Sequence, residues 1–131
     1  MRPRGFTLIE LLVVIAVMGA VMALVGPLGT EQVARSERIS EIRSFESIIK
    51  SQAKQAFLTG SQYQLLLSGK SIVVTKLDDN SSHTVDFEHL FFPNTTLLLS
   101  MNGVYSARSV DYVVTGQSKQ LSLMSVEHEI R

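Results

Sequence analysis

A long apolar segment near the amino terminus constrains this chain more than any other feature. Residues 6–26 carry one charged side chain, Glu10, in a stretch of roughly 21 residues. A helix of that length is about 31 Å long, which matches a hydrocarbon core of about 30 Å. Arg2 and Arg4 precede the segment. Because positive charge stays cytoplasmic, the sequence predicts an amino terminus inside and the remainder exported.

Glu10 is the residue in this segment that needs an explanation. A charge in mid-bilayer costs roughly 2.5–3.5 kcal/mol on insertion scales, although Glu10 lies near the start of the segment and pays less. A secretory signal is one alternative, but the apolar stretch is too long for one and no clear small-x-small cleavage site follows it. A plain membrane anchor is another alternative, and it leaves Glu10 unexplained.

The third interpretation accounts for Glu10 together with the five residues that precede it. Gly5-Phe6-Thr7-Leu8-Ile9-Glu10 resembles the leader junction of type IV pilins and of type II secretion pseudopilins. The resemblance implies that residues 1–5 are a leader, which prepilin peptidase removes between Gly5 and Phe6, and that the new Phe6 amine is N-methylated. It further implies that Glu10 pairs with the amino terminus of a neighbouring subunit during assembly. An unpaired buried charge is strongly penalised, so this pair would select the axial register.

Gly19 and Pro27 agree with the resemblance, because many pilin-like helices carry a glycine and a proline at these positions. Proline removes a backbone donor and glycine is a poor helix former. We therefore expect the helix to be broken or bent near Gly26 and Pro27, and to loosen between Gly19 and Pro27 in an assembled filament. Both residue types are also common in ordinary membrane helices.

The pattern of residues 30–59 predicts a second helical stretch, which continues from the membrane segment of residues 6–29. Apolar side chains recur there at steps of three and four, which marks one buried face. Gly60 is a natural stop. The predicted face consists of Ile39, Ile42, Phe45, Ile49, Ala53 and Ala56. In the family this half of the helix lies across a β-sheet.

Beyond Gly60 the pattern changes to short strands, so we expect a β region over residues 61–127 within an extracytoplasmic domain of residues 30–131. Segments 62–68 and 71–77 predict a hairpin around Gly69-Lys70, and a turn cluster over 78–82 precedes a short run at 83–87. Asn102-Gly103 predicts a second hairpin between 95–101 and 104–107. The last pair of predicted strands is 110–115 and 120–126.

Composition excludes several functions. The 12 basic and 12 acidic side chains balance, which gives no argument for nucleic-acid binding. The chain has no cysteine for a disulfide or a thiolate metal site. His83, Asp86 and His89 could ligate a metal only if they were helical, and Asp78-Asp79-Asn80 lacks the calcium-loop pattern. No nucleophile elbow is present, so we expect no catalytic residue, no metal and no cofactor.

The sequence therefore predicts an α+β, pilin-like subunit with a long amino-terminal helix packed on a small, mainly antiparallel sheet. The expected role is structural, in a type II secretion pseudopilus or a type IV pilus. The expected partners are other pilin subunits, prepilin peptidase and an inner-membrane assembly platform. A minor subunit of the H-type is favoured, because the chain lacks the disulfide and the acidic carboxy-terminal loop of many major subunits. The alternatives are a DNA-uptake pilin and an anchored domain that never assembles.

Overall fold

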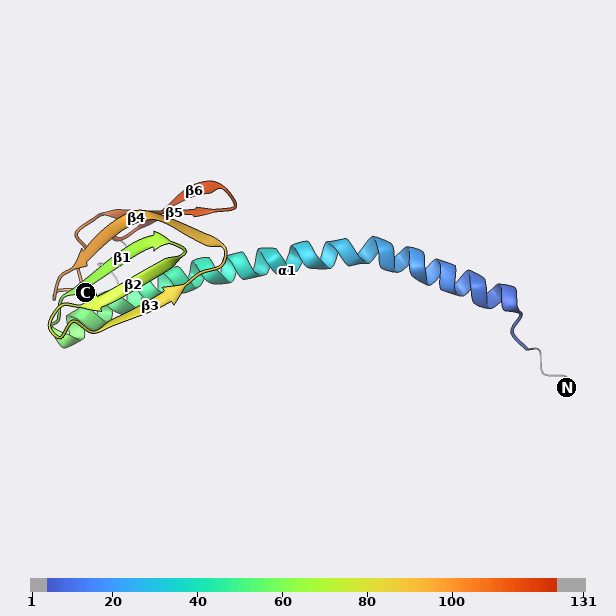
Figure 1. Ribbon diagram of the computed structural model, residues 1–131, viewed down its shortest axis with the longest axis horizontal. Coiled ribbons are helices and arrows are strands. Elements are labelled where there is room, and N and C mark those ends of the chain that lie inside the picture. Colours follow the sequence, from blue (N-terminus) through green and yellow to red (C-terminus); the bar gives the residue numbers. More distant parts are fainter. Residues whose placement is uncertain (1–4, 125–131) are drawn as a thin grey trace. The chain divides into compact units, whose positions relative to one another are not determined.

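A single long helix precedes all the strands of this protein. The computed structural model describes residues 5–124, so the expected leader residues 1–4 and the predicted strand end at 125–127 lie outside the described part (Figure 1). Helix α1 spans Leu8–Thr59. The chain divides into two compact units, Met1–Ser36 and Glu37–Arg131, and α1 contributes to both. Gly60, with a φ of 61°, follows the helix and ends it as expected.

The second unit contains one six-stranded sheet in which every neighbouring pair of strands is antiparallel. The order across the sheet is β3-β2-β1-β4-β5-β6, so β3 and β6 form its two edges (Figure 1). The strands are β1 Tyr63–Gly69, β2 Ser71–Lys76, β3 Ser82–Asp86, β4 Leu90–Leu99, β5 Ser109–Val114 and β6 Gln117–Ser122. This arrangement confirms the expected α+β, pilin-like architecture.

The core of the second unit lies between α1 and one face of the sheet. Phe45, Ile49, Ala53 and Ala56 are fully buried, which confirms most of the predicted helix face. Ile42 is only partly buried, and Ile39 remains 42% exposed, so the packed stripe begins later than the periodicity suggested. The strands contribute alternate buried side chains, as expected for a sheet with one covered face.

The helix and the second predicted hairpin differ in part from what we expected. Helix α1 continues through Gly26 and Pro27, so it is not broken there. The expected strand at 104–107 is also absent, because Tyr105 makes only an isolated bridge with Leu99. Ser106 instead donates its backbone N–H to the Leu98 carbonyl, 2.8 Å away, and its hydroxyl accepts from the Leu98 N–H at 3.0 Å. The Asn-Gly signal therefore marks a turn whose second arm is a loop.

Strand β4 begins at Leu90, five residues before the expected start. The added residues include Pro93, which cannot donate a hydrogen bond to a ladder. The register between β1 and β4 shifts at this point, where Leu67 pairs with Thr95 but Gly69 pairs with Phe92. This irregularity accommodates Pro93 inside a ten-residue strand. The predicted first hairpin and the run at 83–87 are confirmed as β1, β2 and β3.

Candidate functional site

The first turn of α1 holds Glu10 in a reciprocal capping arrangement with Thr7. The Glu10 Oε2 atom accepts hydrogen bonds from the Thr7 backbone N–H and from the Thr7 hydroxyl, both at 3.0 Å. In return, the Glu10 N–H points to Thr7 Oγ1 at 3.4 Å and to the Thr7 carbonyl at 3.1 Å. Thr7 is thus the N-cap residue, and Glu10 is the third helical residue of a capping box.

This geometry gives Glu10 a role within its own chain. A carboxylate in the first turn interacts favourably with the positive end of the helix dipole and satisfies a backbone donor that has no helical partner. The pattern Thr7-x-x-Glu10 is a known helix-start signal that sequence reasoning had overlooked. Both groups bond Oε2, and no described residue hydrogen-bonds Oε1. The carboxylate therefore keeps one oxygen available to a further donor.

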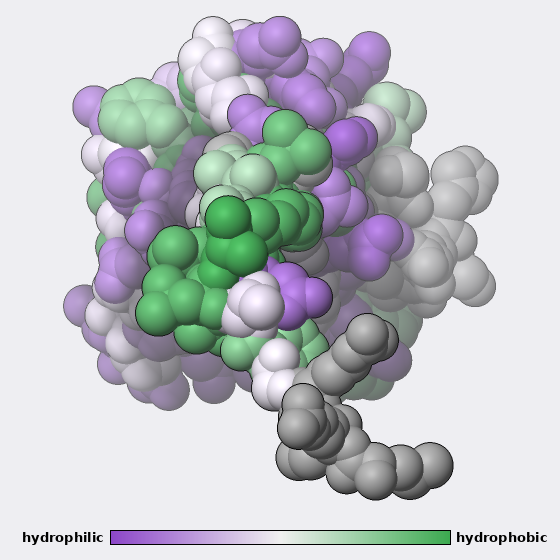
Figure 2. All heavy atoms as spheres, turned by 90° about the vertical axis from the view of Figure 1, so that its right-hand side faces the viewer, coloured by the Kyte–Doolittle hydropathy of each residue, from purple (hydrophilic) through white to green (hydrophobic). Residues whose placement is uncertain are grey.

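The residues next to Glu10 along α1 are apolar, and their side chains are exposed on the surface. The helix is apolar and long enough, by length and composition, to cross a membrane, and its most hydrophobic window is not buried within the protein. Figure 2 shows hydrophobic side chains gathered on the surface at this end of the molecule. Exposed large side chains include Phe6 at 85%, Leu8 at 77% and Leu24 at 77%. A soluble protein rarely exposes so much contiguous apolar surface, so this segment requires a lipid or protein environment.

The remaining residues of the predicted site lie along the same segment. Gly5 and Phe6 precede the helix in extended or irregular backbone. That placement leaves the expected cleavage bond outside regular secondary structure. Gly19 lies within α1 with nothing within 4 Å of the position that a Cβ would occupy. Pro27 lies within the continuous helix, so any loosening there concerns an assembled state.

The possible metal ligands do not converge. His83 and Asp86 occupy β3 three residues apart and so point to opposite faces of the sheet. His89 lies instead beside Glu37, with Nε2 3.5 Å from Oε2. Asp79 accepts from the Ser81 N–H and hydroxyl, which lowers the pKa of its carboxyl and marks ordinary turn chemistry. Among residues 5–124, no three His, Asp or Glu side chains group as metal ligands.

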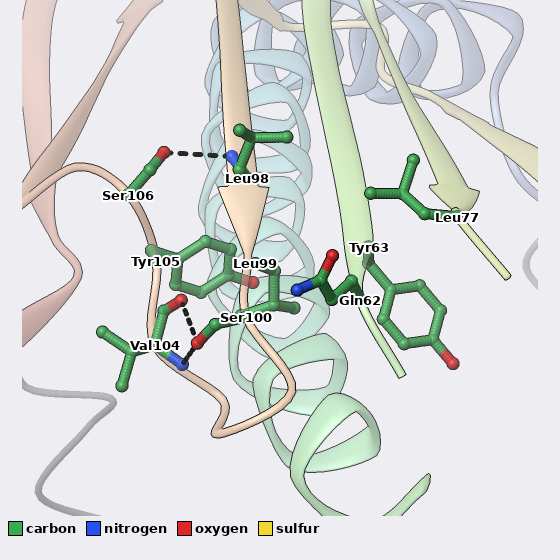
Figure 3. Close-up of a pocket in the computed structure, with 9 residues that line it drawn as sticks. All are labelled: Gln62, Tyr63, Leu77, Leu98, Leu99, Ser100, Val104, Tyr105 and Ser106. Carbon is green, nitrogen blue, oxygen red and sulfur yellow. Dashed lines mark hydrogen bonds between the residues drawn. The ribbon is translucent and has the colours of Figure 1, made fainter. Parts of the chain in front are cut away.

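A hollow of about 350 Å³ opens where β1, β2 and β4 reach the same end of the sheet (Figure 3). The Ser100 hydroxyl is bonded to both the carbonyl and the N–H of Val104. The Ser106 hydroxyl accepts from Leu98, and the Tyr105 hydroxyl donates to the Ile49 carbonyl at 2.8 Å. These three hydroxyl groups are hydrogen-bonded to backbone atoms and hold the loop after β4 in place.

Comparison with known proteins identifies the amino-terminal segment. Residues 1–26 match the family model of the prokaryotic N-terminal methylation motif. No curated protein and no solved structure matches the chain. The motif precedes one long helix and an antiparallel sheet, which is the arrangement expected for a type IV pilin-like protein.

Proposed function

We propose that the protein is a structural subunit of a type II secretion pseudopilus or a type IV pilus. The observation that carries this proposal is the methylation motif over residues 1–26. It coincides with one carboxylate, Glu10, in the apolar first half of α1, where the described side chains are exposed. The subunit is anchored through residues 6–29 in the inner membrane, with its amino terminus in the cytoplasm and the sheet domain outside.

Processing prepares the amino terminus for assembly. Prepilin peptidase cuts between Gly5 and Phe6, which converts the Phe6 nitrogen from an amide into a cationic amine, and methylation leaves that charge in place. Glu10 then pairs with the Phe6 amine of a neighbouring subunit. Because a charge without a partner is costly in an apolar environment, the pair fixes the axial position of one helix against the next.

The capping box supports this role, because it orients Glu10 before a partner arrives. Thr7 bonds Oε2, and Oε1 has no partner among the described residues. A neighbour's amine can therefore bind the carboxylate without first breaking the cap. Gly19 and Pro27 let the helix loosen when subunits pack together.

The sheet domain supplies a surface for partners rather than an active site. We favour a minor subunit of the H-type, since the chain has no cysteine for the disulfide common in major pilins. The partners are other pilin-like subunits and the assembly platform. A structural role without enzymatic activity is typical of this class, and the balanced charge gives no support to the DNA-uptake alternative.

Intact mass of the membrane-extracted protein tests the first step. We expect loss of residues 1–5 and a gain of one methyl group on Phe6. The same protein from cells without prepilin peptidase should retain the leader and carry no methyl group. A mature start near residue 23 or 26 would show ordinary signal-peptidase processing and would overturn the proposal.

A further inference from the structure

Among residues 5–124, no strand pairs with the outer edge of β3. On the inner side of the strand, the Lys76 N–H donates to the Ser81 carbonyl and the Phe87 N–H donates to the Lys70 carbonyl, both at 2.8 Å. In an antiparallel ladder the direction of the backbone groups alternates with each residue. The odd-numbered residues of β3 therefore bond to β2. Ser82, Thr84 and Asp86 direct their N–H and C=O groups away from the sheet.

Strand β6 forms the other edge, and no other strand of the described part pairs with its outer side. Thr115 and Gly116 form a two-residue turn with φ values of 51° and 73°, and Val114 pairs with Gln117 across it. The Leu123 N–H donates to the Arg108 carbonyl at 2.8 Å, so the odd-numbered residues at this end of the chain bond to β5. Ser118 and Gln120 consequently direct their backbone groups outward, at the opposite edge of the sheet from β3 (Figure 1).

The even number of strands in the sheet makes these two edges complementary. Six strands that are each antiparallel to their neighbours leave β3 and β6 running in opposite directions. A second copy placed beside the first in the same orientation therefore offers its β6 antiparallel to β3. Pairing two copies of β3 antiparallel to each other would instead reverse α1 in one copy. Subunits anchored in one membrane share the direction of α1, so this step rests on the anchoring proposed above.

We propose that the sheet domains of neighbouring copies join edge to edge, β3 of one copy pairing antiparallel with β6 of the next. One register of β3 against β6 matches both the outward backbone groups and the two faces of the sheet. It sets Thr84 opposite Gln120 and Asp86 opposite Ser118.

Side-chain chemistry agrees with that register. His83 and Val85 pair with Val74 and Ile72, whose buried side chains place them on the helix-covered face. Leu121 and Lys119 lie on the same face, since they pair with the buried Val110 and Tyr112. The opposite face receives only polar pairs. Strand β3 carries one acidic residue and neither Lys nor Arg, whereas β6 carries Lys119 and no acidic residue, so, His83 aside, the formal charges of the two edges are opposite.

The same short, polar edges weaken pairing in dilute solution, which is how natural sheets avoid aggregation. Anchoring in a membrane raises the effective concentration of one edge near the other, so a weak contact can form there without added affinity. Because the contact joins two different surfaces, it does not close into a two-fold dimer. It holds together those copies of the subunit that stand side by side in the membrane.

Disulfide crosslinking of the full chain in its own membranes tests the proposal. The chain has no cysteine, so every disulfide within or between copies must involve an introduced thiol. A variant with both Thr84→Cys and Gln120→Cys should form a reducible ladder of dimers and higher species under mild oxidation. Either substitution alone should give no ladder. Thr84→Cys with Thr96→Cys is the matched control, because Thr96 is exposed on the inner strand β4.

A proline variant separates edge pairing from random collision. Ser118→Pro in the double-cysteine chain removes an outward N–H of β6 and leaves the ladder with β5 intact. We expect the melting temperature of the domain to stay unchanged and the amount of disulfide-crosslinked oligomer to fall at least tenfold. Three results would each overturn the edge-to-edge contact. They are equal amounts of crosslinked oligomer with Ser118 and with proline, a dimer from Thr84→Cys alone, and no crosslinked oligomer from the double variant. The mass of the mature chain reports on the proposed function independently.

Discussion

The Glu41 carboxylate of α1 accepts a 2.8 Å hydrogen bond from the backbone N–H of His89, on the connection between β3 and β4. Its other oxygen accepts from the Glu88 N–H at the same distance. The Lys70 ammonium donates to the Glu88 carbonyl at 2.8 Å, so the connection is held from both the helix and the sheet. These contacts fix the β3–β4 connection against α1 within the second unit.

Glu41→Ala should lower the free energy of unfolding by about 1–2 kcal/mol, because it leaves two backbone donors without their charged acceptor. Urea unfolding of residues 30–131 measures the change. Glu37→Ala is the matched control, since the Glu37 side chain is 59% exposed and lies beside the His89 ring. It should cost less than about 0.5 kcal/mol. Equal effects of the two changes would contradict the capping role of Glu41.

Phe45→Ala should cost about 3–5 kcal/mol, because the ring is fully buried among other aromatic side chains. Its centroid lies 5.0 Å from that of Phe92, 5.6 Å from that of Tyr112 and 6.3 Å from that of Phe87. Phe57→Ala, on the same helix but 52% exposed, provides the comparison and should cost under about 1 kcal/mol. A cost below about 0.5 kcal/mol for Phe45→Ala would mean that the helix packs through another face.

Tyr105 should make the domain sensitive to alkali. Its hydroxyl donates to the Ile49 carbonyl, and burial raises the pKa of the phenol above the usual value of 10.0. The unfolded chain releases this proton near pH 10 while the folded chain retains it, so stability is full below about pH 10 and falls as the pH rises further.

Tyr105→Phe should cost about 1 kcal/mol at pH 7. It should also flatten the loss of stability above about pH 10, as measured by chemical unfolding at a series of pH values. Part of that loss will remain, because burial and then the nearby Glu46 raise the pKa of Tyr112 too. An unchanged slope between wild type and Tyr105→Phe would contradict the role of the buried hydroxyl.

The sequence supported the main architecture because its strongest signals are local. The apolar run, the face containing Phe45 and Ile49, and the turns at Gly60 and Gly69 each depend on neighbouring residues. The strand residues 90–94 were missed and the loop 104–107 was assigned as a strand, because tertiary contacts decide both segments. A register shift against β1 accommodates Pro93, and hydrogen bonds from Ser106 hold its loop against the end of β4.

The candidate site was predicted in part. The positions of Gly5, Phe6 and Glu10 followed from the motif, whereas the cap between Thr7 and Glu10 was missed. That cap changes the design of any experiment on Glu10. Removing the side chain with alanine abolishes both the cap and the charge, so it cannot separate a helix-capping role from pairing with a neighbour.

Glu10→Gln separates the two roles most directly. Glutamine also completes a capping box, so the variant keeps an acceptor for Thr7 but loses the negative charge. Thr7→Val is the complementary variant, since it removes the hydroxyl and keeps the carboxylate. We expect both proteins to insert and to be cut. At matched expression in a deletion strain, Glu10→Gln should lose at least tenfold in crosslinking to partner subunits and in secretion or piliation, whereas Thr7→Val should lose less. Full assembly and activity of Glu10→Gln would contradict the account and leave a membrane-tethered domain.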